Sequence, residues 1–271
     1  MINLSLLLAD KFPAFARWPA PLRGRMIAWL GWLLCLPEID AFLQLHGHRA
    51  GLEFVGAALD YLNVRWRAFG LEHIPREGPL VIVANHPLGA LDGLSLLQAM
   101  STVRPDVRVV VNDMLWQFKP LRDVMLPVVN VGRGDNKGHI CAINTELRGG
   151  GAIMLFPSGE VSRWSRHGIR DQRWRKGFLH FAREAEASIV PVHIGGRNSG
   201  RFYMLSLLSK PLAMPLLPGE IFRNRNAILP IRVGQALQWR GIADQASFDE
   251  LADTLRAQVY RLAATPRGDA A

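Results

Sequence analysis

Short apolar runs alternate with segments of helical spacing along most of the chain, and this pattern predicts a sheet covered by helices. Runs rich in β-branched residues and bounded by turn residues predict strands. They lie at 64–69, 80–84, 107–112, 128–131, 152–156, 189–194 and 228–233. Apolar residues at helical spacing predict helices at 94–100, 136–147, 178–186 and 248–262. Strands and helices in alternation are typical of an α/β fold with a mostly parallel sheet.

The first 62 residues have a different pattern and are predicted to be helical throughout. The apolar run Met26–Leu36 contains Trp29 and Trp32, is flanked by arginines, and stops at Pro37. It is much shorter than the roughly 20 residues that a membrane-spanning helix needs. Basic residues beside a Trp-rich apolar helix fit a helix lying in the membrane interface. A buried helix that packs on the rest of the chain is an equally good interpretation.

These patterns divide the chain into three parts. We expect a helical membrane-interface segment over residues 1–48, an α/β domain over 49–264, and a disordered tail over 265–271. A domain of this size can bury a full hydrophobic core.

Composition narrows the class of partner. The 32 Lys and Arg residues outnumber the 23 Asp and Glu residues, which gives a net charge of +9. Such a balance favours an anionic partner, whether nucleic acid, an anionic membrane surface or an acidic carrier protein. Cys35 and Cys141 lie far apart in unlike contexts, so neither a disulfide framework nor a cysteine zinc site is predicted, and a reducing compartment fits better.

The strongest chemical signal follows the strand predicted at 80–84. The chain continues there as Asn-His-Pro-Leu-Gly-Ala-Leu-Asp-Gly from Asn85 to Gly93, and a helix is predicted to begin just afterwards, with Asp92 as its N-cap. His86 and Asp92 then share one strand-to-helix connection. A histidine held by a carboxylate is the usual means of taking a proton from a hydroxyl group. The segment therefore predicts an acyl-transfer enzyme.

Three further segments of Gly, Pro and polar residues follow predicted strands. They are Val131–Gly134, Phe156–Glu160 and Gly195–Asn198. Ligands of open α/β sheets bind beyond the carboxyl ends of the strands. We therefore expect the four segments to form one composite site.

Four blocks in order resemble the glycerolipid acyltransferase family, which includes lysophosphatidic acid acyltransferases: Asn85–Asp92, Gly132–Arg133, Phe156–Gly159 and Val190–Val192. Their order is more similar still to a bacterial branch labelled as hemolysins, which contains lyso-ornithine-lipid acyltransferases. The resemblance runs from about Arg49 to Val233 and makes 49–264 an acyltransferase domain. It implies that His86 is the base and Asp92 its orienting partner. It also implies that the substrate-binding residues are Asn85, Arg133, Pro157, Ser158, Gly159, Glu160 and Arg163.

Two positions depart from the family pattern. The spacing from His86 to Asp92 is one residue longer than the usual His-x4-Asp, and the turn around Gly89 can absorb the extra residue because glycine accepts dihedrals that are closed to other residues. The usual Phe-Pro-Glu-Gly-Thr-Arg block here has Ser158, Glu160 and Val161 in place of Glu, Thr and Arg. Arg163 is the nearest substitute for the missing arginine, so a glycerol phosphate acceptor is less favoured.

Two segments outside these blocks are each compatible with several interpretations. The basic segment 163–176 could bind single-stranded nucleic acid, anionic lipid or an acidic carrier, or be a solvated loop. Its position directly after the Pro157–Gly159 loop favours substrate handling, and we expect no nucleic-acid partner. The apolar stretch 202–218 could line an acyl-chain channel, touch the bilayer or pack in the core.

The expected protein is a peripheral O-acyltransferase at the cytoplasmic face of the bacterial inner membrane. It would move a fatty acyl group from an acyl carrier protein or coenzyme A thioester to a lyso-lipid hydroxyl, with a lyso-aminolipid favoured, and it would need no metal or other cofactor. One alternative is a lysophosphatidic acid acyltransferase that makes phosphatidic acid. An alternative of another class is a non-catalytic basic module that binds membranes or nucleic acid.

Overall fold

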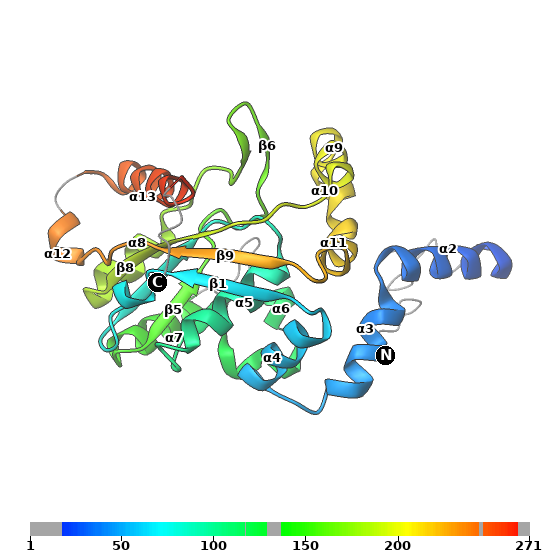
Figure 1. Ribbon diagram of the computed structural model, residues 1–271, viewed down its shortest axis with the longest axis horizontal. Helices are drawn as coiled ribbons and strands as arrows, with labels where there is room; N and C mark the ends of the chain where they lie inside the picture. The colour runs from blue at the N-terminus through cyan, green and yellow to red at the C-terminus, as the bar shows by residue number, and fades with distance from the viewer. Residues whose placement is uncertain (1–17, 117, 129–136, 244–245, 265–271) are drawn as a thin grey trace.

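A seven-stranded sheet forms the centre of the computed structural model, which describes residues 18–116, 118–128, 137–243 and 246–264 (Figure 1). The strand order is β1-β9-β8-β2-β5-β3-β4. The bounds are β1 Arg65–Phe69, β2 Leu80–Ala84, β3 Arg108–Asn112, β4 Met125–Val128, β5 Ala152–Leu155, β8 Ser188–Ile194 and β9 Ile228–Val233.

Neighbouring strands of this sheet are parallel except for β8 and β9, which are antiparallel. β1 and β9 therefore run against the other five strands. The prediction of a mostly parallel sheet is confirmed. A separate antiparallel hairpin, β6 Arg163–Ser165 and β7 Gly168–Arg170, lies within the basic segment that the sequence left as a loop.

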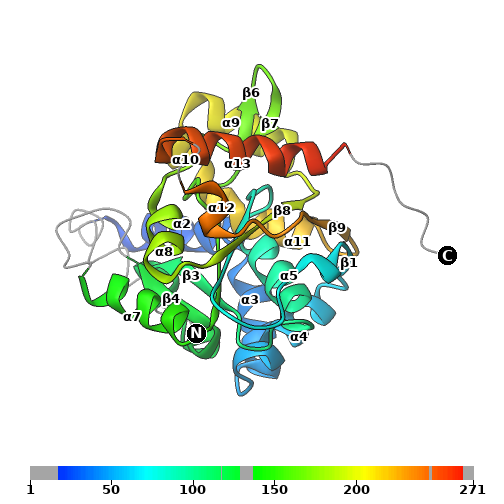
Figure 2. The same cartoon turned by 90° about the vertical axis from the view of Figure 1, so that its left-hand side faces the viewer.

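Helices cover both faces of the sheet (Figure 2). One face packs on α4 (Gly51–Tyr61) and α5 (Ala90–Ser101), and the other on α7 (Lys137–Arg148), α8 (Gly177–Ala185) and α13 (Phe248–Leu262). The shorter helices are η2 Leu71–His73, α6 Asp113–Trp116, η3 Lys119–Val124, η4 Met214–Leu216 and α12 Trp239–Ile242. The result is a three-layer α/β domain.

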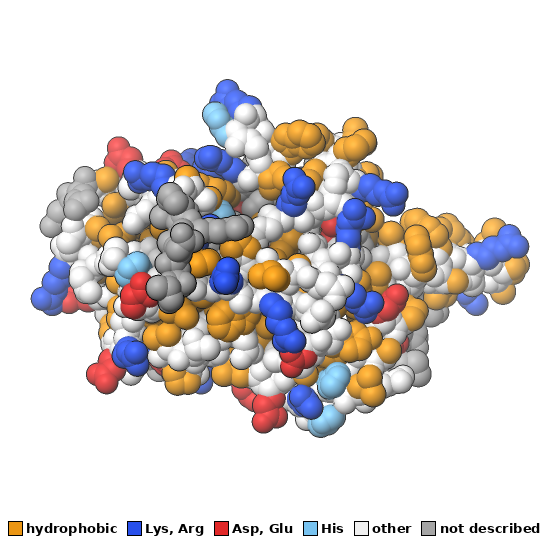
Figure 3. All heavy atoms as spheres, in the orientation of Figure 1, with side chains coloured by type: hydrophobic (Ala, Val, Ile, Leu, Met, Phe, Trp, Pro, Cys, Tyr) orange, Lys and Arg blue, Asp and Glu red, His pale blue; other side chains and the backbone are white. Residues whose placement is uncertain are grey.

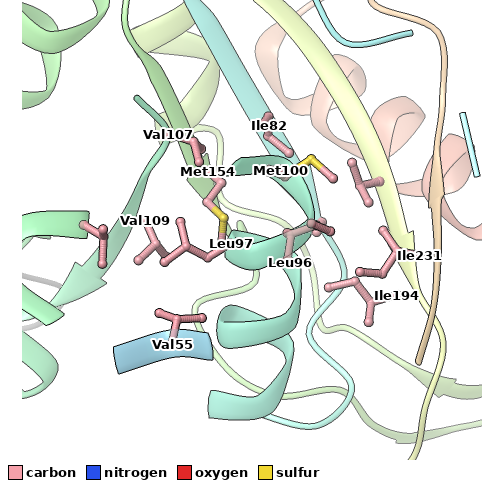
Figure 4. Packing of buried hydrophobic residues seen from close by; sticks show 14 of the residues in the cluster. Val55, Ile82, Leu96, Leu97, Met100, Val107, Val109, Met154, Ile194 and Ile231 are labelled. Atoms are coloured by element: carbon pink, nitrogen blue, oxygen red, sulfur yellow. The ribbon is translucent and has the colours of Figure 1, made fainter. Parts of the chain in front are cut away.

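Strand β2 is a continuous apolar run because it is buried on both faces of the sheet. All five of its residues are fully buried, because alternate side chains point into the two opposite helix layers. Figure 4 shows Ile82 from β2 beside Leu96 and Met100 from α5. Val81 and Val83 face α8 and α13 instead.

The N-terminal helices α2 (Ala20–Leu33) and α3 (Leu36–His46) extend away from the sheet (Figure 1). No residue of α2 is buried, and Trp29 and Trp32 are 54% and 73% exposed. The interpretation of this segment as a helix buried against the domain is therefore wrong. Among the described residues no single helix passes the length and hydropathy test for a membrane span; α2 and α3 pass it only as a pair, bent by 64°.

The apolar stretch 202–218 forms a series of short helices. It lies in α9 (Gly200–Leu208), α10 (Lys210–Ala213), η4 and the start of α11 (Leu217–Arg223). Phe202 and Tyr203 pack in a small core with Val161, whereas Leu207 and Leu208 are 65% and 83% exposed. The stretch therefore has one face in the core and one on the surface.

The predicted element boundaries differ from the structure mainly at two places. The strand expected at 128–131 ends at Val128 and begins earlier, at Met125; residues 129–136 lie outside the described part of the chain. The helix expected to begin at Leu94 begins at Ala90. The tail 265–271 also lies outside the described residues.

Candidate active site

Three neighbouring strands deliver the candidate catalytic segments to one edge of the sheet. β8, β2 and β5 are adjacent and parallel, so the residues that follow them meet at the carboxyl edge. His86 comes two residues after β2, and Phe156 comes directly after β5. Their rings stack with centroids 4.0 Å apart and planes 21° from parallel. Phe156 thus fixes the plane of the His86 imidazole.

His86 faces a buried carboxylate. Its Nδ1 lies 3.2 Å from Oδ2 of Asp92, whose side chain is fully buried, whereas the His86 side chain is 19% exposed. The contact is short enough for an ion pair, but Nδ1 makes no hydrogen bond of good angular geometry. A small rotation of the ring would complete the bond. The structure brings the two residues together as the sequence predicted.

Asp92 is held in place by the turn that it closes. Oδ2 accepts hydrogen bonds from the backbone N–H of Leu88 at 2.6 Å and of Gly89 at 3.0 Å. Burial raises the pKa of Asp92, and this outweighs the lowering effect of His86 and of the two amides. A carboxylate with a raised pKa is a stronger base, and therefore a stronger partner for an imidazolium.

The prediction that Asp92 is the N-cap is wrong by three positions. The helix begins at Ala90 with Gly89 as its N-cap, and the Asp92 side chain in the first turn accepts a hydrogen bond from the Gly89 N–H. Gly89 has φ 92°, a conformation that favours glycine, and this is how the turn absorbs the extra residue between His86 and Asp92. Asp92 therefore both caps the helix and faces the histidine.

The main chain of His86 is held from a second direction by Asp171. Its Oδ1 accepts from the His86 N–H at 3.1 Å and from the Ser162 hydroxyl at 2.5 Å, and its Oδ2 accepts from Trp174 Nε1 at 2.9 Å. Ser162 completes the connection, since its N–H donates to the His86 carbonyl at 2.7 Å. Asp171 is only 2% exposed. It therefore acts as a buried anchor for the loop that carries the histidine.

Two asparagines connect this loop to the end of β8. The side chain of Asn85 accepts from the Ile194 N–H at 2.7 Å and donates to the Ile194 carbonyl at 2.9 Å. Asn198 donates to the Pro87 carbonyl at 3.2 Å. Both side chains are buried. Asn85 thus extends the sheet by one pair of hydrogen bonds, and its direct contact with a substrate stays a prediction.

Gly196 lets the β8 segment approach closely. A Cβ atom at this position would lie 2.7 Å from Leu88, and the φ of 150° is one that other residues rarely adopt. A larger residue at this position would collide with the buried Leu88 side chain and force it to shift.

Polar groups of the loop after β5 form hydrogen bonds with one another. The Ser158 hydroxyl is buried and donates to the Glu160 carbonyl at 2.7 Å. Glu160 accepts from Arg163 Nε at 3.2 Å and from Lys210 Nζ at 2.8 Å. Burial alone would raise the pKa of Glu160, but these two cations outweigh it and hold the pKa below its usual range. Lys210, from α10, is a partner that the sequence did not indicate.

The remaining predicted binding residues differ in their accessibility. Arg163 is 4% exposed, its guanidinium lies 5.8 Å from the centre of the Phe202 ring, and its Nη1 is buried without a hydrogen-bond partner. Pro157 is buried and its carbonyl accepts from the Arg175 N–H, whereas Gly159 is exposed. Arg133 lies outside the described residues. Within the part of the chain that is described, no three His, Cys, Asp or Glu side chains lie close enough together to hold a metal ion.

Sequence reasoning missed three residues that build this site: Asp171, Tyr203 and Lys210. Tyr203 lies in α9, and its hydroxyl accepts from the Asn198 N–H at 2.9 Å. Only Asp171 had a local signal, as the one acidic residue in the basic segment 163–176. The other two lie far along the chain from His86, and only the tertiary fold brings them to this edge.

Comparisons with known proteins identify the family of the chain. The sequence model of a family described as acyltransferase matches residues 6–267. The lyso-glycine lipid O-acyltransferase of Bacteroides thetaiotaomicron is 29% identical over 269 residues, covering 97% of each chain. A lyso-glycine lipid O-acyltransferase of Phocaeicola vulgatus is 28% identical and covers 88% of this chain and 87% of its own.

A solved structure shares the fold. The crystal structure of the 1-acyl-sn-glycerophosphate acyltransferase PlsC from Thermotoga maritima superposes with a TM-score of 0.52. It covers 79% of this chain and 78% of its own, at 17% sequence identity. At this identity the similarity is one of fold.

Proposed function

The chain belongs to the acyltransferase family, and we propose that it transfers a fatty acyl group from a thioester donor to the hydroxyl of a lyso-lipid. The observation that carries the proposal is the pair of His86 and buried Asp92 at the carboxyl edge of the sheet, with Nδ1 and Oδ2 3.2 Å apart. Both relatives described above are named lyso-glycine lipid O-acyltransferases, which supports a lyso-lipid acceptor.

The chemistry follows from which imidazole nitrogen is free. Nδ1 faces Asp92, so Nε2 is the atom that takes the proton of the acceptor hydroxyl. The hydroxyl oxygen attacks the thioester carbonyl carbon, the C–S bond breaks, and the departing thiolate takes the proton from the imidazolium. Asp92 stabilises the imidazolium and holds the required tautomer. The new ester and the free thiol balance the reaction without a covalent acyl-enzyme.

We favour a lyso-aminolipid as the acceptor. The loop after β5 has its arginine, Arg163, buried and bonded to Glu160, so this guanidinium does not face solvent as a phosphate clamp would. The two relatives are named for a glycine lipid, an acceptor built on an amino acid. An acceptor without a phosphate monoester suits this loop better than lysophosphatidic acid does.

We also propose peripheral attachment to the cytoplasmic face of the bacterial inner membrane. Exposed apolar side chains gather over α9 and α10 and along α2 (Figure 3). Trp32 is 73% exposed and Leu208 83%, and the chain carries a net charge of +9 that favours anionic lipids. The elements that carry the two surfaces meet at α11, since a Cβ atom at Gly219 would lie 3.9 Å from Cys35 Sγ and from the Leu33 carbonyl oxygen, at the turn between α2 and α3. An apolar face beside the active-site edge would let a lyso-lipid reach His86 from the bilayer.

The test is acyl transfer by the purified protein with one acyl thioester and two acceptors, a lyso-aminolipid and lysophosphatidic acid. We expect the lyso-aminolipid to be preferred, and we expect His86→Ala to remove transfer, since general base catalysis typically contributes 10²–10⁴-fold. A clear preference for lysophosphatidic acid would replace the acceptor assignment and leave the reaction class intact. Normal turnover by folded His86→Ala protein would refute the enzymatic assignment and favour a binding module.

A further inference from the structure

Four arginines surround two aromatic rings on the face of the sheet that also carries α13. The guanidinium groups of Arg67 and Arg232 lie 6.0 and 5.8 Å from the centre of the Phe69 ring. Those of Arg170 and Arg256 lie 4.8 and 5.8 Å from the Tyr260 ring. We call these residues, together with His193, the arginine cluster.

Strand register joins the two halves of the arginine cluster. Arg232 of β9 pairs with Phe69 of β1 on one side and with His193 of β8 on the other. Directly paired residues point to the same face of a sheet. The three side chains therefore form a row across three strands, and the His193 ring lies 6.0 Å from the Tyr260 ring. In Figure 1, β1 and β9 lie side by side with α13 close by.

The positive charge of the cluster is not matched by carboxylates. Among residues 18–116, 118–128, 137–243 and 246–264, none of the four arginines lies within 4 Å of an Asp or Glu oxygen in an ion pair, although ten other arginine or lysine contacts of this kind occur. Arg256 donates only to the Asp171 carbonyl, and its Nε is buried without a partner. Burial and the charge of Arg232 lower the pKa of His193 to about 4. The positive local potential therefore comes from the four arginines, and His193 stays neutral near pH 7.

The cluster lies beside the catalytic histidine. The side chain of Asn85, the residue before His86, bonds the main chain of Ile194, the residue after His193. Adjacent strands are about 4.8 Å apart, so Arg232, two strands from β2, lies roughly 10 Å from that position across the sheet. Tyr260 touches the same network, because its hydroxyl accepts from the Asp171 N–H at 2.6 Å.

We propose that the arginine cluster is a phosphate-binding subsite for the acyl donor. This inference rests on the proposed function. Coenzyme A and acyl carrier protein both carry a phosphate at the far end of a pantetheine arm, and both would present it while the thioester lies at His86. Arginine is suited to this task because its planar guanidinium binds phosphate through two hydrogen bonds. The Phe69 and Tyr260 rings, which lie against the guanidinium groups, hold them in position before the donor arrives.

The test compares an acyl thioester that carries phosphate with one that does not. In the double variant Arg67→Gln/Arg232→Gln, we expect the KM for acyl-coenzyme A to rise about tenfold, with the KM for the same acyl group on pantetheine unchanged. Arg122→Gln is the matched control: this guanidinium also lies over an aromatic ring, 5.6 Å from that of Trp116, beside the opposite edge of the sheet. An equal rise for both donors, or no rise, would overturn the proposal.

Direct binding separates this proposal from the reaction itself. Calorimetric titration of the full chain with coenzyme A, without any acceptor, should show binding that the double variant weakens about tenfold and Arg122→Gln does not. This result would support the subsite even if transfer to lyso-lipids failed. Equal binding of coenzyme A by the wild type and the double variant would refute the subsite. A KM rise confined to a phosphate-bearing lyso-lipid would also refute it, because the arginine cluster would then bind the acceptor head group. Arg67→Gln alone changes an exposed side chain and keeps the test valid if the double variant unfolds.

Discussion

Replacement of Asp171 by asparagine tests how the catalytic loop is built. The carboxylate accepts hydrogen bonds from the His86 N–H, the Ser162 hydroxyl and the Trp174 indole N–H, and it is almost completely buried. An amide of the same shape has one acceptor oxygen and one NH₂ donor. The substitution therefore keeps the volume of the side chain and changes its charge and its hydrogen bonding.

The expected magnitude follows from counting donors. If the amide oxygen faces His86 and Ser162, its NH₂ group faces the Trp174 indole; if the amide is reversed, the NH₂ group faces the His86 N–H. One buried N–H loses its acceptor in either orientation, which costs about 1–3 kcal/mol. We expect the free energy of unfolding to fall by about that amount. We also expect kcat to fall by up to roughly 10²-fold, because a shift of the loop by about 1 Å misplaces the base.

The measurement is a denaturant unfolding curve together with kcat, KM and the pH profile of transfer. A positioning role predicts that kcat falls while the apparent pKa of the base and the KM of the donor stay close to wild type. Asp249→Asn is the matched control, since Asp249 pairs with Arg173 and Lys176 of the same segment but is half exposed. Loss of stability with normal kcat would show that Asp171 supports only the fold. No change in either quantity would refute the buried network.

Three further predictions concern other parts of the chain. Asp92→Asn should leave only residual transfer, yet it should not lower the thermal midpoint at pH 7. Burial raises the pKa of Asp92 in the folded protein, so ionising this carboxyl costs stability as the pH rises above the usual carboxyl pKa. The neutral amide avoids that cost. Trp32→Ser should weaken flotation with anionic vesicles, whereas Ile140→Ser, which changes an exposed apolar residue of α7, should not; equal flotation would exclude α2 from the contact. Asp106→Asn should lower the free energy of unfolding by about 1 kcal/mol at neutral pH and leave it unchanged at acid pH. The Arg104 hydrogen bond lowers the pKa of this partly exposed carboxyl, so the stabilisation is lost as pH falls through the folded pKa. A loss of stability that does not depend on pH would refute this reasoning.

Sequence reasoning located two strands at their observed bounds. The run 80–84 has no polar residue and ends at an Asn-His-Pro turn, so its bounds in β2 match the prediction. The run at 228–233 matches β9 equally well. Sequence reasoning missed the hairpin of β6 and β7, which lies between these two strands in the sequence. Each of its strands has only three residues, and neither Arg-Trp-Ser nor Gly-Ile-Arg gives an alternating apolar pattern long enough to predict a strand. Its pairing depends on the turn at Gly168, which has φ 90°.

The start of α5 shows how one residue can satisfy two local patterns. From the sequence, Asp92 before an apolar run is a good candidate for the N-cap of the helix. An acidic residue in the first turn, three positions after the N-cap, gives nearly the same sequence pattern. The choice between them is made by Gly89, whose positive φ lets the chain enter the helix three residues earlier. That earlier start places Asp92 in the first turn, where one carboxylate closes the helix and faces His86. The motif was therefore predictable, whereas its geometry required the turn.

The supporting residues of the site could not be predicted in the same way, because their partners are distant in the sequence. Asp171 lies 85 residues from His86, and Asn198 lies 111 residues from Pro87. In a segment with six lysines and arginines, a single aspartate has the pattern of ordinary charge balance on a solvated loop. The structure buries that aspartate and leaves Arg170 and Arg256 on the other side of it, around Tyr260. One acidic residue thus separates the loop that carries the base from the cluster that we assign to the donor phosphate, so a change at Asp171 should affect kcat and a change at Arg232 should affect donor binding.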